Sequence, residues 1–184
     1  MTPSARRDRF EDVAAEVVEP LRRFLARRTD PATADDVLAD TLLVCWRRID
    51  EVPDPPLAWT YAVARLGLAN ATRSARRQRR VAAKVATIDP PPTVVAGPGA
   101  DASDHAAAVE ALTEAMAALP DKDAELVRLW AWEQLSPAEI AVVLDLTANA
   151  VSIRLHRARG RLREELRKVG VGAGHEESRE RRTP

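Results

Sequence analysis

Residues 135–163 read LSPAEIAVVLDLTANAVSIRLHRARGRLR, a stretch that predicts two helices joined by a three-residue turn. The first helix begins at residues 136–139, SPAE, because Ser136 can cap free N–H groups while a proline follows and a glutamate lies three positions on. Residues 145–147 form the predicted turn, and the hydroxyl of Thr147 suits the cap of the second helix. The stretch therefore predicts a helix-turn-helix.

The second of these helices has two unlike faces. Its apolar positions recur at three- and four-residue steps, which predicts one buried face: Val151, Leu155, Ala158, Leu162 and Leu166. The opposite face is polar and rich in arginine: Asn149, Ser152, Arg154, Arg157, Arg161 and Arg163. Such a helix fits the major groove of DNA, with its first turn near base edges and its arginines near phosphates. An ordinary amphipathic helix with a solvated basic face is the alternative.

Charge is balanced overall but divided along the chain. The 184 residues fit one or two small domains, and 28 Lys and Arg match 28 Asp and Glu. Net basicity therefore gives no argument for nucleic acid. Basic residues nevertheless concentrate at 73–84 and 154–168, with an acidic block at 101–146 between them. This division favours a protein that touches one polyanion at two places.

Residues that carry metal or redox chemistry are sparse. Cys45 is the only cysteine, so an internal disulfide is excluded, and we expect its thiol to pack as a small hydrophobic group. The three histidines lack metal-ligand spacing. We expect no metal, no cofactor and no catalytic residue. No apolar run approaches the ~20 residues that span a bilayer, and the N-terminus lacks an apolar signal core, which predicts a cytoplasmic protein without membrane insertion.

Helical periodicity runs through the first half of the chain. A first helix is expected to point these residues inward: Phe10, Val13, Val17, Leu21 and Phe24. A second helix, opened by Thr33, has its own apolar stripe: Val37, Leu38, Thr41, Leu42, Cys45 and Ile49. Three prolines make residues 50–56 a loop. A third helix starts near Leu57, where Trp59 shares a core face with Val63 and Leu66, and Tyr61 lies off that face.

The second half begins after a segment rich in Pro, Gly and small residues. We expect a helix at about 104–119, with these residues inward: Val109, Leu112, Met116 and Leu119. Another helix is expected from Asp121 to Trp132, with Trp130 and Trp132 in or near the core. The predicted fold is all-α, with two small helical domains on a flexible linker. Their bounds are a domain at 1–84, the linker at 85–103, a domain at 104–168 and a disordered tail at 169–184.

Three stretches resemble the bacterial sigma-70 family, in its small two-domain group, the extracytoplasmic-function (ECF) sigma factors. Residues 119–166 resemble sigma region 4, including the segment RLHRAR at 154–159. Residues 35–49, DDVLADTLLVCWRRI, resemble the region 2 helix that docks on RNA polymerase, and residues 57–80 resemble the region 2 helix that engages the −10 element. The resemblance implies a non-enzymatic factor that binds core RNA polymerase, directs it to promoters through −35 and −10 elements, and promotes strand opening.

The resemblance also assigns residues to partners. The face of the second helix that lies away from its core stripe would dock on the polymerase clamp of the β′ subunit: Asp36, Asp40, Leu43 and Arg47. The third helix would contact the −10 element: Tyr61, Arg65, Asn70, Arg73, Arg76 and Arg77. The recognition helix would contact the −35 element: Asn149, Ser152, Ile153, Arg154, His156 and Arg157. By analogy, the loop at 50–56 would help to capture an unstacked base. Further implied partners are the β flap and an anti-sigma factor.

Some positions depart from the family pattern. Ala39-Asp40 stands where the family usually has Gln-Glu, and Asp145 stands in the turn where glycine is usual and must accept a left-handed backbone. Ala150, Ser152 and Ile153 replace more polar residues, so no −35 sequence is assigned. Two alternatives stay open at this point. One is a helix-turn-helix regulator that acts without polymerase, and the other is a sigma-like antagonist that only occupies polymerase.

Overall fold

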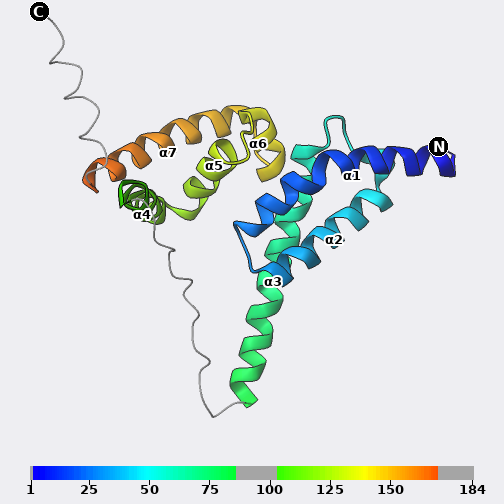
Figure 1. The fold of residues 1–184 in the computed structure, drawn as a ribbon, viewed down its shortest axis with the longest axis horizontal. Coiled ribbons are helices and arrows are strands. Elements are labelled where there is room, and N and C mark those ends of the chain that lie inside the picture. Colours follow the sequence, from blue (N-terminus) through cyan, green and yellow to red (C-terminus); the bar gives the residue numbers. More distant parts are fainter. Residues whose placement is uncertain (1, 86–102, 170–184) are drawn as a thin grey trace, which may run out of the picture. The chain divides into compact units, whose positions relative to one another are not determined.

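A computed structural model of the chain describes residues 2–85 and 103–169, so the predicted linker and tail fall almost entirely outside the described residues. Within these two stretches the fold is all-helical, with seven α-helices and one short 3-10 turn (Figure 1). This confirms the predicted fold class. Compact packing divides the chain into two units, Met1–Pro92 with Ala138–Leu146 and Thr93–Pro137 with Thr147–Pro184. The domain bounds drawn from the sequence stay a prediction.

The first unit contains three long helices that pack on one another, α1 (Pro3–Ala26), α2 (Pro31–Arg47) and α3 (Leu57–Val85) (Figure 1). Most of the predicted apolar positions of the first two helices are buried in its core: Val13, Val17, Leu21, Phe24, Val37, Leu38, Cys45 and Ile49. The thiol of Cys45 is fully buried, as the sequence predicts, and burial raises its pKa.

The start of α2 differs from the sequence expectation. Asp30, rather than Thr33, caps the helix: its Oδ1 accepts a hydrogen bond from the backbone N–H of Thr33 at 3.0 Å. Pro31 takes the first helical position, where its missing N–H is not needed. Because the proline fixes the helix start, the preceding aspartate becomes the cap. Thr33 lies within the first turn.

The connection from α2 to α3 begins with the 3-10 turn η1 (Ile49–Glu51) and continues without regular structure to Pro56. The predicted loop thus contains one 3-10 turn and no α-helix. Ile49 and Val52 are buried in the core of the unit and anchor the connection from inside. α3 starts at Leu57, as predicted.

The buried face of α3 is not the one that the sequence suggests. Thr60, Tyr61 and Ala64 are buried, whereas Leu66 is 59% exposed. Trp59 and Val63 are only partly buried. The reason lies in the contact between helices, because a Cβ added at Gly67 would lie 3.0 Å from Cγ1 of Val37. α3 approaches α2 through small residues, and this close approach, rather than the size of the apolar side chains, sets the orientation of α3.

In the second unit, α4 (Ser103–Ala117) and α5 (Asp121–Ala131) pack against α7 (Ala148–Lys168). The core contains Met116, Leu119, Ala124, Val127 and Ala158, with Leu162 packed against it. The sequence expectation for α4 is half wrong. Alanines at 111 and 115 are buried beside the methionine, whereas Val109 and Leu112 face outward. As in α3, small side chains occupy the helix contact.

Trp130 and Trp132, expected in or near this core, are 38% and 43% exposed. Both lie at the end of α5, where Trp132 is the residue that caps the helix. The guanidinium of Arg159, on α7, lies 4.2 Å from the centroid of the Trp130 ring. A cation on the ring face leaves the tryptophan partly open to solvent while still fixing its place.

Candidate nucleic-acid interface

A turn of three residues, 145–147, joins α6 (Pro137–Leu144) to α7. Asp145 follows the last residue of α6 and has φ of 54°, in the left-handed region. The N–H of Leu146 donates to the carbonyl of Ala141 at 3.0 Å, which closes the end of α6. Oγ1 of Thr147 accepts from the N–H of Ala150 at 3.2 Å. The predicted turn at 145–147, the backbone of Asp145 and the Thr147 cap are all confirmed.

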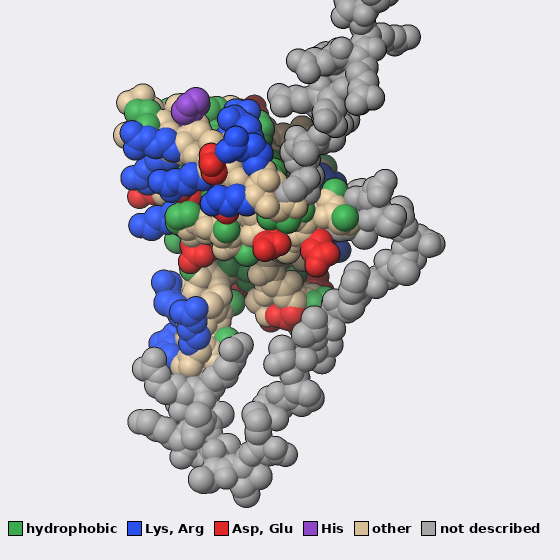
Figure 2. Space-filling model, turned by 90° about the vertical axis from the view of Figure 1, so that its left-hand side faces the viewer, with side chains coloured by type: hydrophobic (Ala, Val, Ile, Leu, Met, Phe, Trp, Pro, Cys, Tyr) green, Lys and Arg blue, Asp and Glu red, His purple; other side chains and the backbone are tan. Residues whose placement is uncertain are grey.

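α7 separates a buried face from an exposed one. Val151, Leu155 and Ala158 are buried, as the apolar spacing predicts. The six residues expected at the −35 element are all exposed: Asn149, Ser152, Ile153, Arg154, His156 and Arg157. The hydroxyl of Ser152 donates to the carbonyl of Ala148 at 2.9 Å, so its oxygen can still accept from a ligand. On the face of the molecule drawn in Figure 2, Lys and Arg side chains gather densely with few acids among them.

Two later arginines of α7 have partners within the unit that the sequence does not reveal. Arg159 stacks on Trp130, and Arg161 forms a salt bridge with Asp123 of α5. These contacts tie α7 to α5 and hold both guanidinium groups toward the protein. Arg154 and Arg157, nearer the start of the helix, are therefore the better candidates for phosphate contacts.

Of the six residues of α3 that are expected to contact DNA, one differs from the others in its exposure to solvent. Five of the six residues are exposed: Arg65, Asn70, Arg73, Arg76 and Arg77. Oδ1 of Asn70 accepts a hydrogen bond from the guanidinium of Arg73, one turn further on. Tyr61 does not belong with them. It is 2% exposed, and its ring centroid lies 4.8 Å from that of Phe24. The expectation that Tyr61 faces DNA is wrong, because α3 turns this residue into the core.

The four residues expected to dock on polymerase lie along the exposed side of α2: Asp36, Asp40, Leu43 and Arg47. Leu43 is a large apolar side chain in solvent between charged neighbours. Trp46, which the sequence does not single out, is also exposed on this helix. Its ring forms a T-shaped pair with that of Phe10, with 5.4 Å between the centroids. α2 thus carries an apolar and charged surface opposite its core stripe.

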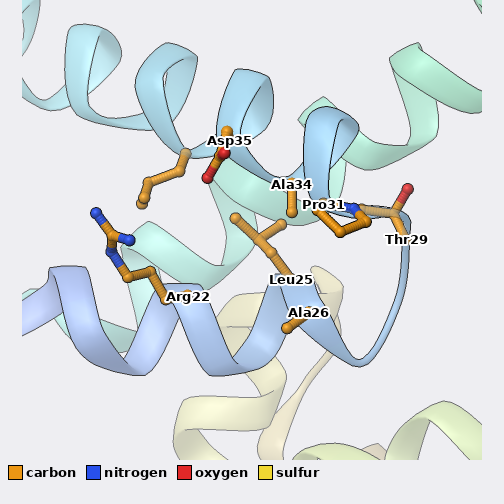
Figure 3. A pocket seen from close by; sticks show the side chains of 8 residues that line it. Arg22, Leu25, Ala26, Thr29, Pro31, Ala34 and Asp35 are labelled. Atoms are coloured by element: carbon orange, nitrogen blue, oxygen red, sulfur yellow. The ribbon is translucent and has the colours of Figure 1, made fainter.

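A pocket of about 260 Å³ opens between α1 and α2. Its walls are mostly apolar, with Leu25 and Leu38 among them, and Arg22 and Asp35 extend toward one another from opposite helices (Figure 3). A small-molecule site needs several polar groups that converge on one ligand. The polar side chains that line this pocket are Arg22, Thr29 and Asp35, so it gives little support to a ligand-controlled regulator.

The described residues also limit other kinds of site. In the stretches 2–85 and 103–169, no three His, Cys, Asp or Glu side chains come together as metal ligands. Over the same part of the chain, none of the helices is both long and apolar enough to cross a membrane.

Comparison with known proteins places the chain in a family. The family described as Sigma-70, region 4 matches residues 109–162. The RNA polymerase sigma-E factor of Streptomyces coelicolor is 34% identical over 175 residues, which cover 94% of this chain and 95% of that protein. The ECF RNA polymerase sigma factor SigL of Mycobacterium tuberculosis is 30% identical over 82% of this chain and 85% of its own length. The chain belongs to the sigma-70 family, in its ECF group.

The fold agrees with this assignment. The sigma factor RpoE, solved in complex with the anti-sigma factor NepR from Bartonella quintana, matches with a TM-score of 0.58 at 20% identity over 86% of this chain and 96% of that one. The function that follows from the family is that of a sigma factor in transcription initiation, which is not a catalytic role. The two alternatives, a regulator without polymerase and an antagonist, are not favoured.

Proposed function

We propose that this chain binds core RNA polymerase through α2, contacts the −10 element through α3 and contacts the −35 element through α7. The observation that carries the proposal is the exposed polar face in the first half of α7, directly after the turn at 145–147 and the Thr147 cap. Together these contacts direct polymerase to specific promoters and promote strand opening. The place of action is the cytoplasm, where bacterial polymerase meets DNA.

At the −35 element, α7 enters the major groove by its N-terminal end. Asn149 and Ser152 lie in its first turns and reach base edges, whereas Arg154 and Arg157 reach phosphates. Ile153 is 46% exposed and offers an apolar contact, for example to a thymine methyl group. This mixture supports readout by a few polar groups and one apolar group.

At the −10 element, the exposed arginines of α3 hold the backbone, and Asn70 reaches a base. The loop at 50–56 helps to capture a base that has left the stack. Extrusion of a base costs about a few kcal/mol, which binding of the base must offset. With Tyr61 buried, that binding falls to the loop and to exposed parts of α3 rather than to this aromatic ring.

The protein partners follow from the exposed surfaces. The face of α2 that carries Asp36, Asp40, Leu43 and Arg47 meets the β′ clamp, and the exposed Trp130 and Trp132 support a contact with the β flap. An anti-sigma factor covers these surfaces when the protein is not bound to polymerase. Two solved complexes of proteins with a similar fold support this partner: RpoE bound to the anti-sigma factor NepR, and CnrH bound to the cytosolic domain of CnrY. The CnrH match has a TM-score of 0.51 at 22% identity.

In vitro transcription tests this function. The purified chain is added to bacterial core polymerase and fragmented genomic DNA from the source organism, and the transcript starts are sequenced. We expect discrete starts that share upstream −35 and −10 elements and disappear without the chain. Polymerase binding without any starts would support the antagonist, and no polymerase binding would support a separate DNA-binding regulator.

A further inference from the structure

The first turns of α1 are bonded to the far end of α2 and to the connection that follows it. Nη2 of Arg6 donates to the carbonyl of Trp46 at 2.7 Å and to that of Arg47 at 3.2 Å. Nη1 of the same side chain lies 3.3 Å from Oδ2 of Asp50. One turn further along α1, Nη2 of Arg9 donates to the carbonyl of Pro53 at 3.5 Å. Two arginines of α1 therefore hold successive points of one segment.

The chemistry of Arg6 suits this position. The last four carbonyls of a helix lack partners within the helix, and the end of the helix carries partial negative charge. A guanidinium presents five N–H donors in a planar fork, so it can bond two such carbonyls and a carboxylate together. The side chain is also fixed from another side, since its guanidinium lies 5.3 Å from the centroid of the Trp46 ring. A lysine ammonium cannot reproduce this set of bonds.

The segment that these arginines contact, the loop at 50–56, has few backbone hydrogen-bond donors of its own. Pro53, Pro55 and Pro56 have no backbone N–H and cannot donate hydrogen bonds. Val52 is buried, while residues 53–55 are exposed. Burial of Val52 and Pro56 thus fixes the inner side of the segment. Arg6 bonds to it at Asp50, and Arg9 bonds to its exposed part at the carbonyl of Pro53.

We propose that Arg6 and Arg9 are positioning residues for strand opening, because they fix the loop at 50–56 in the place where it receives an unstacked base. The inference rests on the proposed function of that loop. Neither arginine needs to touch DNA. A loop that is ordered before binding loses less conformational entropy when it captures the base, so capture is tighter.

The test uses holoenzyme assembled from core polymerase and the full chain, with Arg6→Ala, Arg6→Lys and Arg9→Ala variants. Arg7→Ala is the matched control, because Arg7 lies between them on α1 but is 76% exposed and pairs with Glu11 on its own helix, whereas Arg6 is 31% exposed. Two quantities are measured. One is affinity for a single-stranded oligonucleotide that spans the −10 element of a promoter found by transcription, and the other is affinity for core polymerase.

We expect Arg6→Ala to weaken oligonucleotide binding about tenfold, since charge-assisted hydrogen bonds support a change of that size. Arg6→Lys should lose most of the same affinity although it keeps the charge, and Arg9→Ala should lose less. Polymerase affinity should not change in any variant, and Arg7→Ala should bind the oligonucleotide like the wild type. Permanganate reactivity of unpaired thymines on the duplex promoter should fall in the same order.

Several outcomes overturn the proposal. Unchanged oligonucleotide binding in a folded Arg6→Ala variant does so, as does full activity of Arg6→Lys, which would show that charge alone matters. An equal loss of affinity for polymerase and for the oligonucleotide would show that Arg6 only stabilises the fold. If circular dichroism shows that Arg6→Ala is unfolded, Arg6→Lys and Arg9→Ala decide by the same criteria. A wild-type holoenzyme that does not prefer the −10 oligonucleotide over a scrambled one overturns the proposed function itself, and the inference with it.

Discussion

Tyr61 stabilises the first unit instead of facing DNA. It is among the largest fully buried side chains, and its ring packs against Phe24. Loss of a buried aromatic side chain costs about 3–5 kcal/mol, because it removes apolar contacts and leaves a cavity. We therefore expect Tyr61→Ala to lower the free energy of unfolding by about this amount, as measured by urea denaturation. Unchanged stability with weaker DNA binding would contradict the burial and return Tyr61 to the DNA surface.

Two helical glycines should respond oppositely to alanine. A Cβ at Gly160 in α7 would meet nothing within 4 Å, so Gly160→Ala should raise the free energy of unfolding by about 0.5–1 kcal/mol. At Gly67 the Cβ would lie 3.0 Å from Val37, and overpacking of about 1–3 kcal/mol should cancel that gain. Thermal unfolding of both variants measures the difference. A gain at both positions would show that α2 and α3 are not in tight contact there.

At the scale of the element, the cap at the start of α2 should make the free energy of unfolding depend on pH in the acidic range. The hydrogen bond from the Thr33 backbone N–H is the largest cause that lowers the pKa of Asp30 below its ordinary value of 3.8. The folded pKa is below the unfolded one, so the carboxylate stabilises the fold above the unfolded pKa, and this contribution is lost as the pH falls.

Asp30→Ser tests this dependence, since serine caps a helix without titrating. We expect the variant to lose less stability than the wild type when urea denaturation at neutral pH is compared with denaturation below about pH 4. Equal losses in the two proteins would show that the Asp30 carboxylate does not contribute to the acid response.

The exposed face of α2 should govern polymerase affinity. Asp36→Lys and Asp40→Lys reverse charge on the docking face without touching buried residues, so the helical content should stay unchanged. We expect each to weaken core polymerase binding by about tenfold or more, because reversed charges in an interface cost several kcal/mol. Asp12→Lys, on an exposed position of α1, is the matched control. Wild-type affinity in both α2 variants would remove the docking face from this helix.

At the scale of the whole molecule, DNA binding must depend on local charge, because the net charge is zero. Arg154→Ala and Arg157→Ala should each make the negative slope of log affinity against log salt about one unit less steep, as expected for the loss of one phosphate contact. Arg167→Ala, whose side chain pairs with Glu164 near the end of α7, should leave the slope unchanged. Titration of promoter affinity against salt measures this. Equal slopes in all variants would exclude phosphate contacts by the first two arginines.

Both units should contribute to the salt dependence of promoter affinity. Because Arg73 and Arg154 lie on different helices in different units, combining Arg73→Ala with Arg154→Ala in the holoenzyme should make the negative slope about two units less steep. A slope as steep as that of either single variant would mean that the two helices do not bind the promoter at the same time.

Local features of this protein follow from its sequence alone. The helix that starts at Pro137, the turn with a left-handed Asp145, the Thr147 cap and the buried stripe of α7 were all predictable. Each depends on residues within a few positions of one another, so short-range steric and hydrogen-bonding preferences are sufficient to determine it. The outward placement of Arg154 and Arg157 follows from the same stripe.

Other features were decided only by tertiary packing. Alanine-rich helices such as α3 and α4 offer several similar apolar faces, and the face that is buried depends on which neighbour can approach closely, as Gly67 and Val37 show. That choice buries Tyr61. The bonds of Arg6 to α2 join residues 40 and more positions apart, which no local pattern encodes. The sequence alone therefore determined the elements and the exposed face of the recognition helix, whereas the positions of α3 and of the loop before it required the contacts between helices.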